Sequence, residues 1–160
     1  MNAKDIMTAS PECCSAGDSI KDVARLMRDN DCGVVPILAD DTAKVVGIVT
    51  DRDLAIRGYA EGKGPDASVG DLMTASPVCC NANDNIRDVE KAMAEHQVRR
   101  VPIVDERGRC IGIVAQADLA RAAKDNGVTE REIAIVVEKL SEPASEPIHR
   151  TGSPTLEQQF

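Results

Sequence analysis

Residues 5–14 read DIMTASPECC, and residues 71–80 read DLMTASPVCC, so the same stretch occurs twice at an offset of 66 residues. The correspondence runs on through the segments that follow. It closes with Gly-Ile-Val at residues 47–49 and 112–114, where the offset has become 65 residues. An internal repeat of this length indicates the architecture before any single residue is interpreted. It predicts two similar half-units related by a pseudo-twofold axis, with a cleft where they meet.

The repeat divides the 160-residue chain into predicted units. Residues 1–60 are assigned to the first repeat, 61–68 to a linker that contains glycine and proline, and 69–124 to the second repeat. A capping box predicts a further helix at 129–141, and the proline-bearing residues 142–160 predict an irregular tail. A half of about 60 residues buries too little surface to be stable by itself. We therefore expect the two halves to stabilise each other.

Each repeat predicts the order strand, helix, strand, strand, helix. Asp18 and Asp84 are expected to cap the first helix of each repeat, and Gly33 to end the first of these helices. The apolar residues of both helices recur at helical spacing. Pro36 is expected to mark an edge position or a strand end, because proline cannot donate to a ladder. Runs of β-branched residues predict four strands, at 34–38, 45–49, 98–104 and 110–114.

Composition argues against several classes of function. A net charge of −8 disfavours a nucleic-acid partner, since phosphate contacts need a basic surface. No apolar run approaches the roughly 20 residues of a membrane span, and no signal peptide is recognised. The six cysteines then predict reduced thiols in a cytoplasmic protein. No constellation of nucleophile and base is found, so no enzymatic activity is expected.

These patterns resemble a pair of cystathionine-β-synthase (CBS) domains, also called a Bateman module. The resemblance covers about residues 4–121 and rests on the doubled Asp-hydrophobic-Met-Thr opening, the doubled Val-Pro-Ile strand and the closing Gly-Ile-Val-Thr-Asp-Arg-Asp segment. It implies a mixed α/β (α+β) fold of two β-α-β-β-α repeats packed sheet to sheet, followed here by the C-terminal helix. It also implies a small stand-alone bacterial regulatory protein, similar to the hypoxic response proteins, that senses an adenine nucleotide between its repeats.

The resemblance implies that Thr50 and Asp53 contact the ribose of the ligand. A carboxylate can accept hydrogen bonds from both ribose hydroxyls, and such charge-assisted bonds are the stronger class. The same two residues also have the spacing of a helix capping box, a structural role that is compatible with binding. In the second repeat Ala115 replaces the threonine while Asp118 remains. We therefore rank the cleft built on Asp53 first and the cleft built on Asp118 second.

Further contacts are implied on the same grounds. Arg99 and Arg100 would supply the positive charge that phosphates need in an acidic chain, and one of them is expected to point inward because strand neighbours alternate. The alternative is a surface pair, bound to Glu95 or Asp105. The residues implied around the adenine, which could equally be ordinary core, are Ile48, Val78 and Cys79 in the first cleft and Cys13 and Val34 in the second.

The sulfur-containing residues of the repeated stretch leave alternatives open. One cysteine of each pair, 13–14 and 79–80, is expected in the core because strand neighbours face opposite ways. Met7 and Met73 are expected to pack in the interior. A zinc site across the repeats, with His96, and a thiol redox sensor are the alternatives to simple burial. Because Cys-x-x-Cys spacing is absent, no metal site is predicted.

The leading hypothesis is a non-enzymatic regulatory module that binds AMP, ADP or ATP. It would signal the energy state to an unidentified partner protein, and S-adenosylmethionine is an alternative ligand. The competing hypothesis is a structural scaffold that dimerises and binds no nucleotide. A homodimer is expected under both, with the helix at 129–141 available to clamp the neighbouring subunit.

Overall fold

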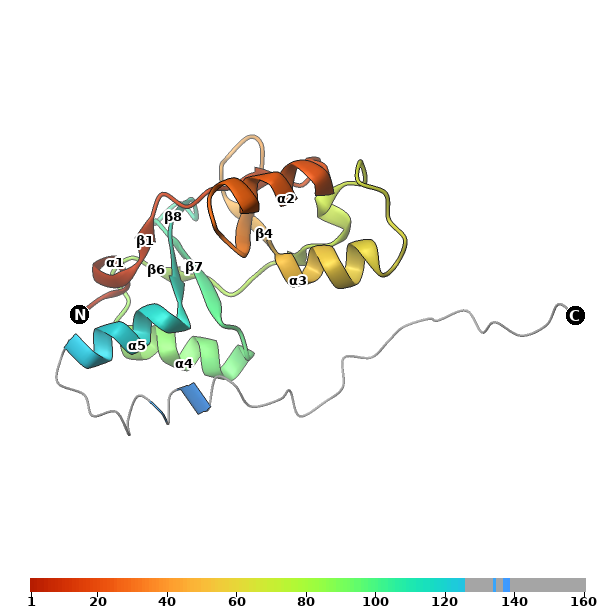
Figure 1. Ribbon diagram of the computed structural model, residues 1–160. Helices are drawn as coiled ribbons and strands as arrows, with labels where there is room; N and C mark the ends of the chain where they lie inside the picture. The colour runs from red at the N-terminus through yellow and green to blue at the C-terminus, as the bar shows by residue number, and fades with distance from the viewer. Residues whose placement is uncertain (126–133, 135–136, 139–160) are drawn as a thin grey trace, which may run out of the picture.

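The computed structural model describes residues 1–125, 134 and 137–138. Within them the chain forms two four-stranded sheets and five α-helices (Figure 1), which confirms the expected mixed α+β fold. Apart from the three isolated positions, the helix expected at 129–141 and the tail expected at 142–160 lie outside the described residues. No helix in this described part of the chain is long and apolar enough to cross a membrane.

The first sheet has the strand order β2-β3-β4-β5. Its members are β2 (Cys14–Ser15), β3 (Val34–Leu38), β4 (Val45–Thr50) and β5 (Thr74–Ala75). Because β3 has a neighbour on each side, the expectation that Pro36 marks a strand edge or end was wrong. The proline is tolerated because β2 pairs only with Ile37 and Leu38, so Pro36 lies just beyond the end of this short neighbour.

The second sheet repeats this arrangement in the order β6-β7-β8-β1. Its members are β6 (Cys80–Asn81), β7 (Arg100–Val104), β8 (Cys110–Ala115) and β1 (Thr8–Ala9). The opening strand of each repeat pairs with the other repeat: Thr8 lies opposite Ile113, and Thr74 lies opposite Ile48. Neither sheet is therefore complete without a strand from the other half, which gives the mutual stabilisation of the halves a physical basis.

The first long helix of each repeat starts one residue later than expected. These two helices are α2 (Ile20–Asp29) and α4 (Ile86–His96). Ser19 and Asn85 cap them by accepting hydrogen bonds from backbone N–H groups in the first turn. Asp18 and Asp84, the expected caps, instead accept the N–H groups of Ser15 and Asn81 at 2.8 and 2.7 Å. Each aspartate thus closes the turn that leads into the cap.

Gly33 does not end α2, whose C-cap is Asn30. It provides space instead: a Cβ atom at Gly33 would lie 2.9 Å from Oδ2 of Asp51. The carbonyl oxygen of Gly33 also accepts the N–H of Asp51 at 3.1 Å. The start of β3 and the residue after β4 can therefore approach each other closely, because no side chain stands between them.

The remaining helical segments complete each half. They are α1 (Ala3–Ile6), α3 (Asp51–Asp53), the π-helical turn η1 (Leu54–Tyr59), the 3₁₀ turn η2 (Val69–Asp71) and α5 (Gln116–Asp125). In Figure 1, α1 and β1 at the N-terminus lie beside β6, β7, β8, α4 and α5, whereas α2, α3 and β4 lie in the other half. The N-terminal segment of the chain therefore lies in the half that contains the second repeat's sheet.

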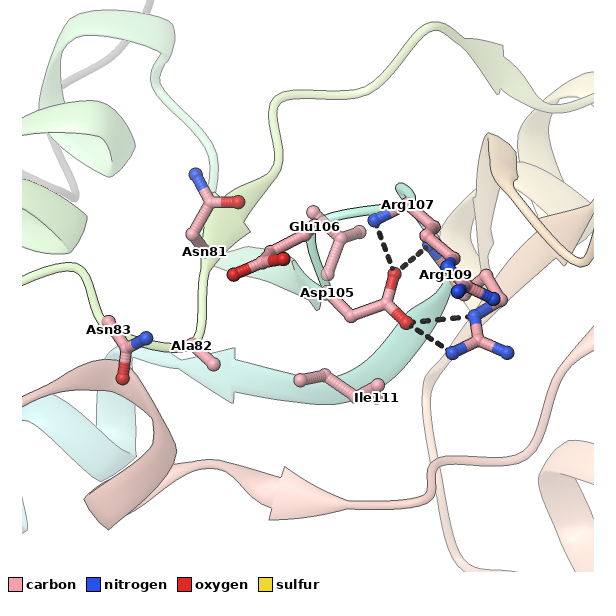
Figure 2. Close-up of a pocket in the computed structure, with 9 residues that line it drawn as sticks. Asn81, Ala82, Asn83, Asp105, Glu106, Arg107, Arg109 and Ile111 are labelled. Carbon is pink, nitrogen blue, oxygen red and sulfur yellow. Dashed lines mark hydrogen bonds and ion pairs between the residues drawn. The ribbon is translucent and has the colours of Figure 1, made fainter.

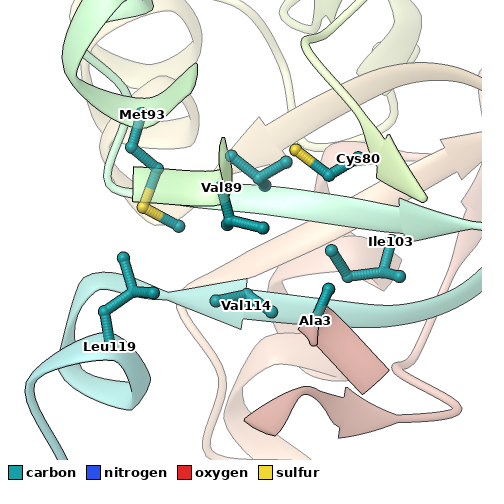
Figure 3. Packing of buried hydrophobic residues seen from close by; sticks show 8 residues of the cluster. Ala3, Cys80, Val89, Met93, Ile103, Val114 and Leu119 are labelled. Atoms are coloured by element: carbon teal, nitrogen blue, oxygen red, sulfur yellow. The ribbon is translucent and has the colours of Figure 1, made fainter. Parts of the chain in front are cut away.

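Two aliphatic cores correspond to the two sheets. Figure 3 shows one of them, in which Ala3 from α1 packs with Val89 and Met93 of α4 and with Val114 of β8. Conversely, Val69 and Leu72 of the second repeat pack in the core beneath the sheet of the first repeat. The cluster that they join consists of Val23, Met27, Val35, Ile37, Val49, Val69 and Leu72. Each core thus buries residues contributed by both repeats.

Met7 and Met73 occupy equivalent positions in the two repeats, and each packs on the strand that pairs with the opening strand of its own repeat. Met7 packs over Gly112 of β8, and Met73 packs over Gly47 of β4, which confirms that both methionines pack; each side chain is half-buried. A Cβ atom at either glycine would lie 2.3 Å from the methionine sulfur. A side chain at either position would therefore displace the methionine that packs over it.

Candidate functional site

Thr50 and Asp53 form a capping box at the junction of β4 and α3. The N–H of Asp53 donates to Oγ1 of Thr50 at 3.1 Å, and Oδ2 of Asp53 accepts both the N–H and the hydroxyl of Thr50, at 2.9 and 2.8 Å. Local sequence suffices for this arrangement, because the strand ends where the threonine can cap. The result is a carboxylate held in one orientation, with its side chain 17% exposed.

The second oxygen of the Asp53 carboxylate is engaged less tightly. Its Oδ1 lies 3.6 Å from Nε of Arg57, one turn later on η1, and no other contact to this oxygen is made within the described part of the chain. Arg57 is itself held by the carbonyl oxygen of Leu72, to which Nη1 donates at 3.0 Å. Asp53 therefore keeps an acceptor beside a fixed positive charge.

Asp53 lines a cleft of about 860 Å³ between the two repeats. One wall comes from β4 and α3, a second from β5 and the residues after it, and a third from the turn between α4 and β7. The lining residues are Val34, Ile48, Thr50, Asp51, Arg52, Asp53, Thr74, Ser76, Pro77, Val78, His96, Gln97, Val98, Arg99 and Arg100. This volume is within the range of small-molecule sites.

Arg99 and Arg100 both line this cleft, although only one was expected to point inward. Strand alternation does not apply to the pair, because β7 begins at Arg100 and Arg99 precedes it. The alternative partners are occupied, since Glu95 pairs with Lys91 at 3.7 Å and Asp105 with Arg109 at 2.7 Å. Neither arginine side chain makes an ion pair within the described residues, so two exposed positive charges line the same cleft as Asp53.

The other residues that the sequence predicted to line the two clefts do not all lie where they were expected. Ile48 and Val78 line the cleft with Thr50 and Asp53. Val34, assigned to the second cleft, lines this one, and Cys79 is not among its lining residues. Which of these side chains contact a ligand stays a prediction.

The corresponding aspartate of the second repeat is more fully engaged. Oδ2 of Asp118 accepts the N–H of Ala115 at 2.8 Å, and Oδ1 accepts from Nη1 of Arg121 at 2.9 Å. Its side chain is 15% exposed, close to the value for Asp53. The missing hydroxyl at residue 115 and the shorter arginine contact both distinguish this aspartate from Asp53, which agrees with ranking its cleft second.

Sequence reasoning missed several residues of the cleft. Ser76 takes a positive φ of 49°, and its counterpart Ser10 takes 48°, a conformation that non-glycine residues seldom adopt. Gln97, the αL cap of α4 with φ 51°, also lines the cleft, beside His96. The identity of the two Thr-Ala-Ser-Pro segments was a usable signal, since strained positions tend to cluster at functional sites. No comparable signal marks Gln97.

A further cavity, of about 470 Å³, lies beside the hairpin between β7 and β8 (Figure 2). Asp105 accepts the N–H groups of Arg107 and Arg109 at 2.9 and 3.0 Å and pairs with the Arg109 guanidinium. These bonds, led by the backbone N–H of Arg109, hold the pKa of Asp105 below its ordinary value of 3.8. The carboxylate charge is therefore used to close the turn of the hairpin.

The two cysteine pairs, 13–14 and 79–80, each have one member in or against a hydrophobic core. Cys80 is buried in one core, which confirms the expectation for the pair 79–80, whereas Cys14 is half-buried and packs against the other core. Burial raises the pKa of Cys14 to about 12 and that of Cys80 to about 11. Among the residues that the structure describes, no group of three or more histidine, cysteine or acidic side chains could hold a metal ion.

Comparisons with known proteins agree with this architecture. The family model of the CBS domain matches residues 3–57 and 69–125. Hypoxic response protein 1 of Mycobacterium tuberculosis is 39% identical over 129 residues, which span 80% of this chain and 89% of that protein. A crystal structure of Hypoxic Response Protein I with two coordinated zinc ions has a TM-score of 0.68 at 40% identity, and the match covers 76% of this chain and 98% of that one.

Two other solved structures contain adenine-bearing ligands. CBSX2 of Arabidopsis thaliana, in complex with AMP, has a TM-score of 0.69 at 29% identity, over 79% of this chain and 98% of that one. The CBS domain pair of protein MJ0100, in complex with 5′-methylthioadenosine and S-adenosyl-L-methionine, has a TM-score of 0.71 at 25% identity, also over 79% and 98% of the two chains.

Proposed function

Because this chain belongs to the CBS-domain family, as a CBS pair, we propose that it is a regulatory module that binds an adenine nucleotide between its repeats. The observation that carries this proposal is the cleft of about 860 Å³, which is lined both by an anchored carboxylate and by two arginines that lack ion-pair partners among the described residues. AMP, ADP and ATP are the proposed ligands. The AMP complex of CBSX2 supports this class, and the MJ0100 complex keeps S-adenosylmethionine as an alternative.

Asp53 is proposed to bind the ribose. Its Oδ2 is saturated by Thr50, which fixes the carboxylate, while Oδ1 has only the 3.6 Å contact with Arg57. The two ribose hydroxyls would donate to this carboxylate, and Thr50 can add a hydroxyl contact from the same helix start. Preorganisation matters here because a carboxylate that is already ordered loses little conformational entropy when it binds.

Arg99 and Arg100 are proposed to bind the phosphates. A chain with a net charge of −8 repels anionic ligands unless the site supplies local positive charge, which these two residues do. The adenine would lie against the apolar part of the lining, to which Ile48, Val78 and Val34 belong. Cys79, next to Val78 in the chain, is retained as a possible backbone contact to the base.

A second, weaker site is proposed at Asp118, with Cys13 as a neighbouring contact. It lacks the threonine hydroxyl, and Arg121 already occupies Oδ1 of the aspartate at 2.9 Å. We propose no metal site: zinc is present in the structure of Hypoxic Response Protein I, but the described residues of this chain contain no suitable donor group. We propose no catalytic activity either.

Calorimetric titration of the full chain with AMP, ADP, ATP, adenosine and S-adenosylmethionine tests the proposal. We expect heat of binding for at least one phosphorylated nucleotide, with a weaker response to adenosine. No heat for any of these ligands, from protein shown by mass spectrometry to carry no copurified nucleotide, would leave the sensor proposal without support.

We propose that the module acts as a homodimer in the cytoplasm. It would pass the nucleotide signal to a partner protein. The basis for the homodimer is the surface of η1, where Tyr59 is 88% and Ile56 is 52% exposed. Large apolar side chains that gather on one surface often mark an interface. The same observation favours the second candidate function, a dimerising scaffold without a ligand. Titration separates the two, because only the sensor binds nucleotide.

A further inference from the structure

Arg57 contacts two walls of the cleft at once, although it is not among the residues that line it. Its Nε lies 3.6 Å from Oδ1 of Asp53, which belongs to the wall formed by β4 and α3. Its Nη1 donates at 3.0 Å to the carbonyl oxygen of Leu72, which leads into the wall formed by β5 and the residues after it. The guanidinium therefore joins the carboxylate proposed to bind ribose to the backbone of the second repeat.

Leu72 is a well-fixed anchor for this contact. Its side chain is fully buried in the core of the first sheet, and its N–H donates to the carbonyl oxygen of Val69 at 3.0 Å. Two residues later, Thr74 pairs with Ile48 of β4 and lines the cleft. The carbonyl oxygen of Leu72 is thus held in place at the point where the second wall begins.

The local fold of η1 brings Arg57 to Leu72. In this π-helical turn the N–H of Ala60 donates to the carbonyl oxygen of Ala55 at 2.9 Å. Gly58 is buried, and a Cβ atom there would lie 3.3 Å from Cδ1 of Leu72, so the turn lies directly against this leucine. Single π-helical turns are rare and occur frequently at functional sites. The close approach of Gly58 keeps the neighbouring guanidinium within reach of the Leu72 carbonyl.

The second repeat is built differently at this position. At the offset of 65 residues that relates Asp53 to Asp118, the residue equivalent to Arg57 is Ala122, whose side chain is too short to join two walls. Arg121 instead contacts Oδ1 of Asp118 at 2.9 Å, from a side chain that is 75% exposed, compared with 42% for Arg57. The bridging arginine therefore belongs to the cleft that is ranked first.

We propose that Arg57 is a positioning residue for ribose recognition: by holding Oδ1 of Asp53 and the carbonyl oxygen of Leu72 together, it fixes the carboxylate relative to the wall that begins with β5. This inference rests on the proposed function, since it concerns how Asp53 meets a nucleotide. Thr50 holds the carboxylate through Oδ2, and a second contact at Oδ1 restricts rotation about that oxygen. Hydrogen bonds weaken steeply when donor and acceptor are misaligned, so a small rotation of the acid is costly. The planar guanidinium suits this role because its nitrogens can serve separate partners in a fixed geometry.

Calorimetric titration of the full chain with AMP and with dideoxy-AMP, which lacks both ribose hydroxyls, tests the proposal. We expect the wild-type chain to bind AMP more tightly than dideoxy-AMP. Arg57→Ala, which copies the equivalent residue of the second repeat, is expected to lower the affinity for AMP about tenfold, the equivalent of one hydrogen bond to a charged group, and to leave the affinity for dideoxy-AMP nearly unchanged. A merely structural role would not move this preference for an intact ribose, because damage to the fold weakens both ligands alike.

The outcomes separate this inference from the proposed function. A wild-type chain that binds neither ligand would overturn both. If the wild-type chain binds AMP and Arg57→Ala binds it equally well, only the positioning role is overturned. An equal loss of both ligands in Arg57→Ala would also overturn that role, as would a wild-type chain that binds the two ligands with equal affinity.

Two further variants complete the comparison. Arg57→Lys keeps the positive charge but lacks the planar fork, so a several-fold loss of AMP affinity is expected to remain. Full wild-type affinity in Arg57→Lys would show that charge alone suffices and would contradict the role of two simultaneous contacts. Arg25→Ala is the matched control and should change neither affinity, because Arg25 also makes an ion pair at 3.6 Å, with Asp22, but lies on α2 away from the lining of the cleft. Circular dichroism checks folding, and Arg57→Lys replaces Arg57→Ala if the alanine variant is unfolded.

Discussion

Oδ2 of Asp53 accepts two hydrogen bonds from Thr50, one from its N–H at 2.9 Å and one from its hydroxyl at 2.8 Å. One residue pair thus both caps a helix and orients the acid proposed to bind the ligand. The structural and the binding interpretations of these residues do not compete, because the cap uses one carboxylate oxygen and leaves the other with a single long contact to Arg57.

Asp53→Ala is expected to lower the affinity for AMP by about a hundredfold, because two charge-assisted hydrogen bonds to the ribose are worth roughly 3 kcal/mol together. The variant loses only the carboxylate half of the capping box and keeps Thr50 as the N-cap, which should cost no more than about 1 kcal/mol of stability, so it is expected to fold. Calorimetric titration measures the affinity and thermal unfolding the stability. Asp118→Ala is the matched control, and an equal loss of affinity in that variant would contradict the ranking of the two clefts.

Arg100→Ala is expected to weaken ATP binding by about tenfold, in line with the loss of one hydrogen bond to a charged group, and to leave adenosine binding nearly unchanged. The physical reason is that the arginine is proposed to contact phosphate, which adenosine lacks. Competition titrations with both ligands provide the comparison. Arg107→Ala makes the same change of charge on the β7–β8 hairpin and should affect neither ligand, whereas an equal loss of both ligands in Arg100→Ala would argue against a phosphate role.

Gly47→Ala and Gly112→Ala are each expected to destabilise the fold by about 1–3 kcal/mol, because the added methyl group would overlap the sulfur of Met73 or Met7. The free energy of unfolding from urea titration measures the effect. Gly17→Ala places a methyl group where no atom lies within 4 Å and should be close to neutral. Similar values for all three variants would indicate that the methionines move aside without cost.

Asp105→Asn is expected to lower the thermal midpoint near neutral pH, and the difference from wild type should narrow as the pH falls. The backbone and guanidinium groups of Arg109 depress the pKa of folded Asp105 below 3.8. The carboxylate therefore contributes its stability above the unfolded pKa, and that contribution is lost as the pH falls through the folded value. Thermal unfolding of both proteins at about pH 7 and about pH 2 checks the sign, and a gap that widens in acid would refute it.

The paired substitution Ile56→Glu with Tyr59→Glu is expected to convert a dimer into a monomer, because it would place charge at the proposed apolar interface. Both side chains are exposed, so the fold should survive. Sedimentation velocity of the two proteins at equal concentration measures the change. Arg107→Glu serves as a charge control elsewhere on the surface, and a wild-type chain that sediments as a monomer would exclude this interface.

Several features could be predicted from sequence because they depend on neighbouring residues. The strand at 34–38 lies where the β-branched run placed it, the strand predicted at 98–104 begins two residues later at Arg100, and the capping box of Thr50 and Asp53 forms between residues three apart. The N-caps of the two helices were predicted one residue too early, at Asp18 and Asp84, whereas the structure has them at Ser19 and Asn85. Asp18 and Ser19 are both good caps, and only the turn before the helix selects between them.

Which residues make up the candidate site depends on contacts between residues that are far apart in the sequence. Arg99 and Arg100 lie about fifty residues from Asp53, and their inclusion in one cleft depends on how the two repeats pack. Val34 shares that cleft because Gly33 allows the start of β3 to approach Asp51. A single unaligned sequence contains no periodic signal for such contacts, since they arise from packing between elements.

The sequence by itself determined that the chain has two similar halves, that both cores are aliphatic, and that one aspartate sits in a complete capping box while its counterpart does not. The tertiary structure alone decided that β1 joins the sheet of the second repeat and β5 that of the first. The physical reason is the separation along the sequence of the residues that interact. Helical periodicity and capping are set within a few residues, whereas two nearly identical opening strands can each pair with either sheet. Their choice depends on how the two repeats pack together, which involves residues that lie far apart in the chain.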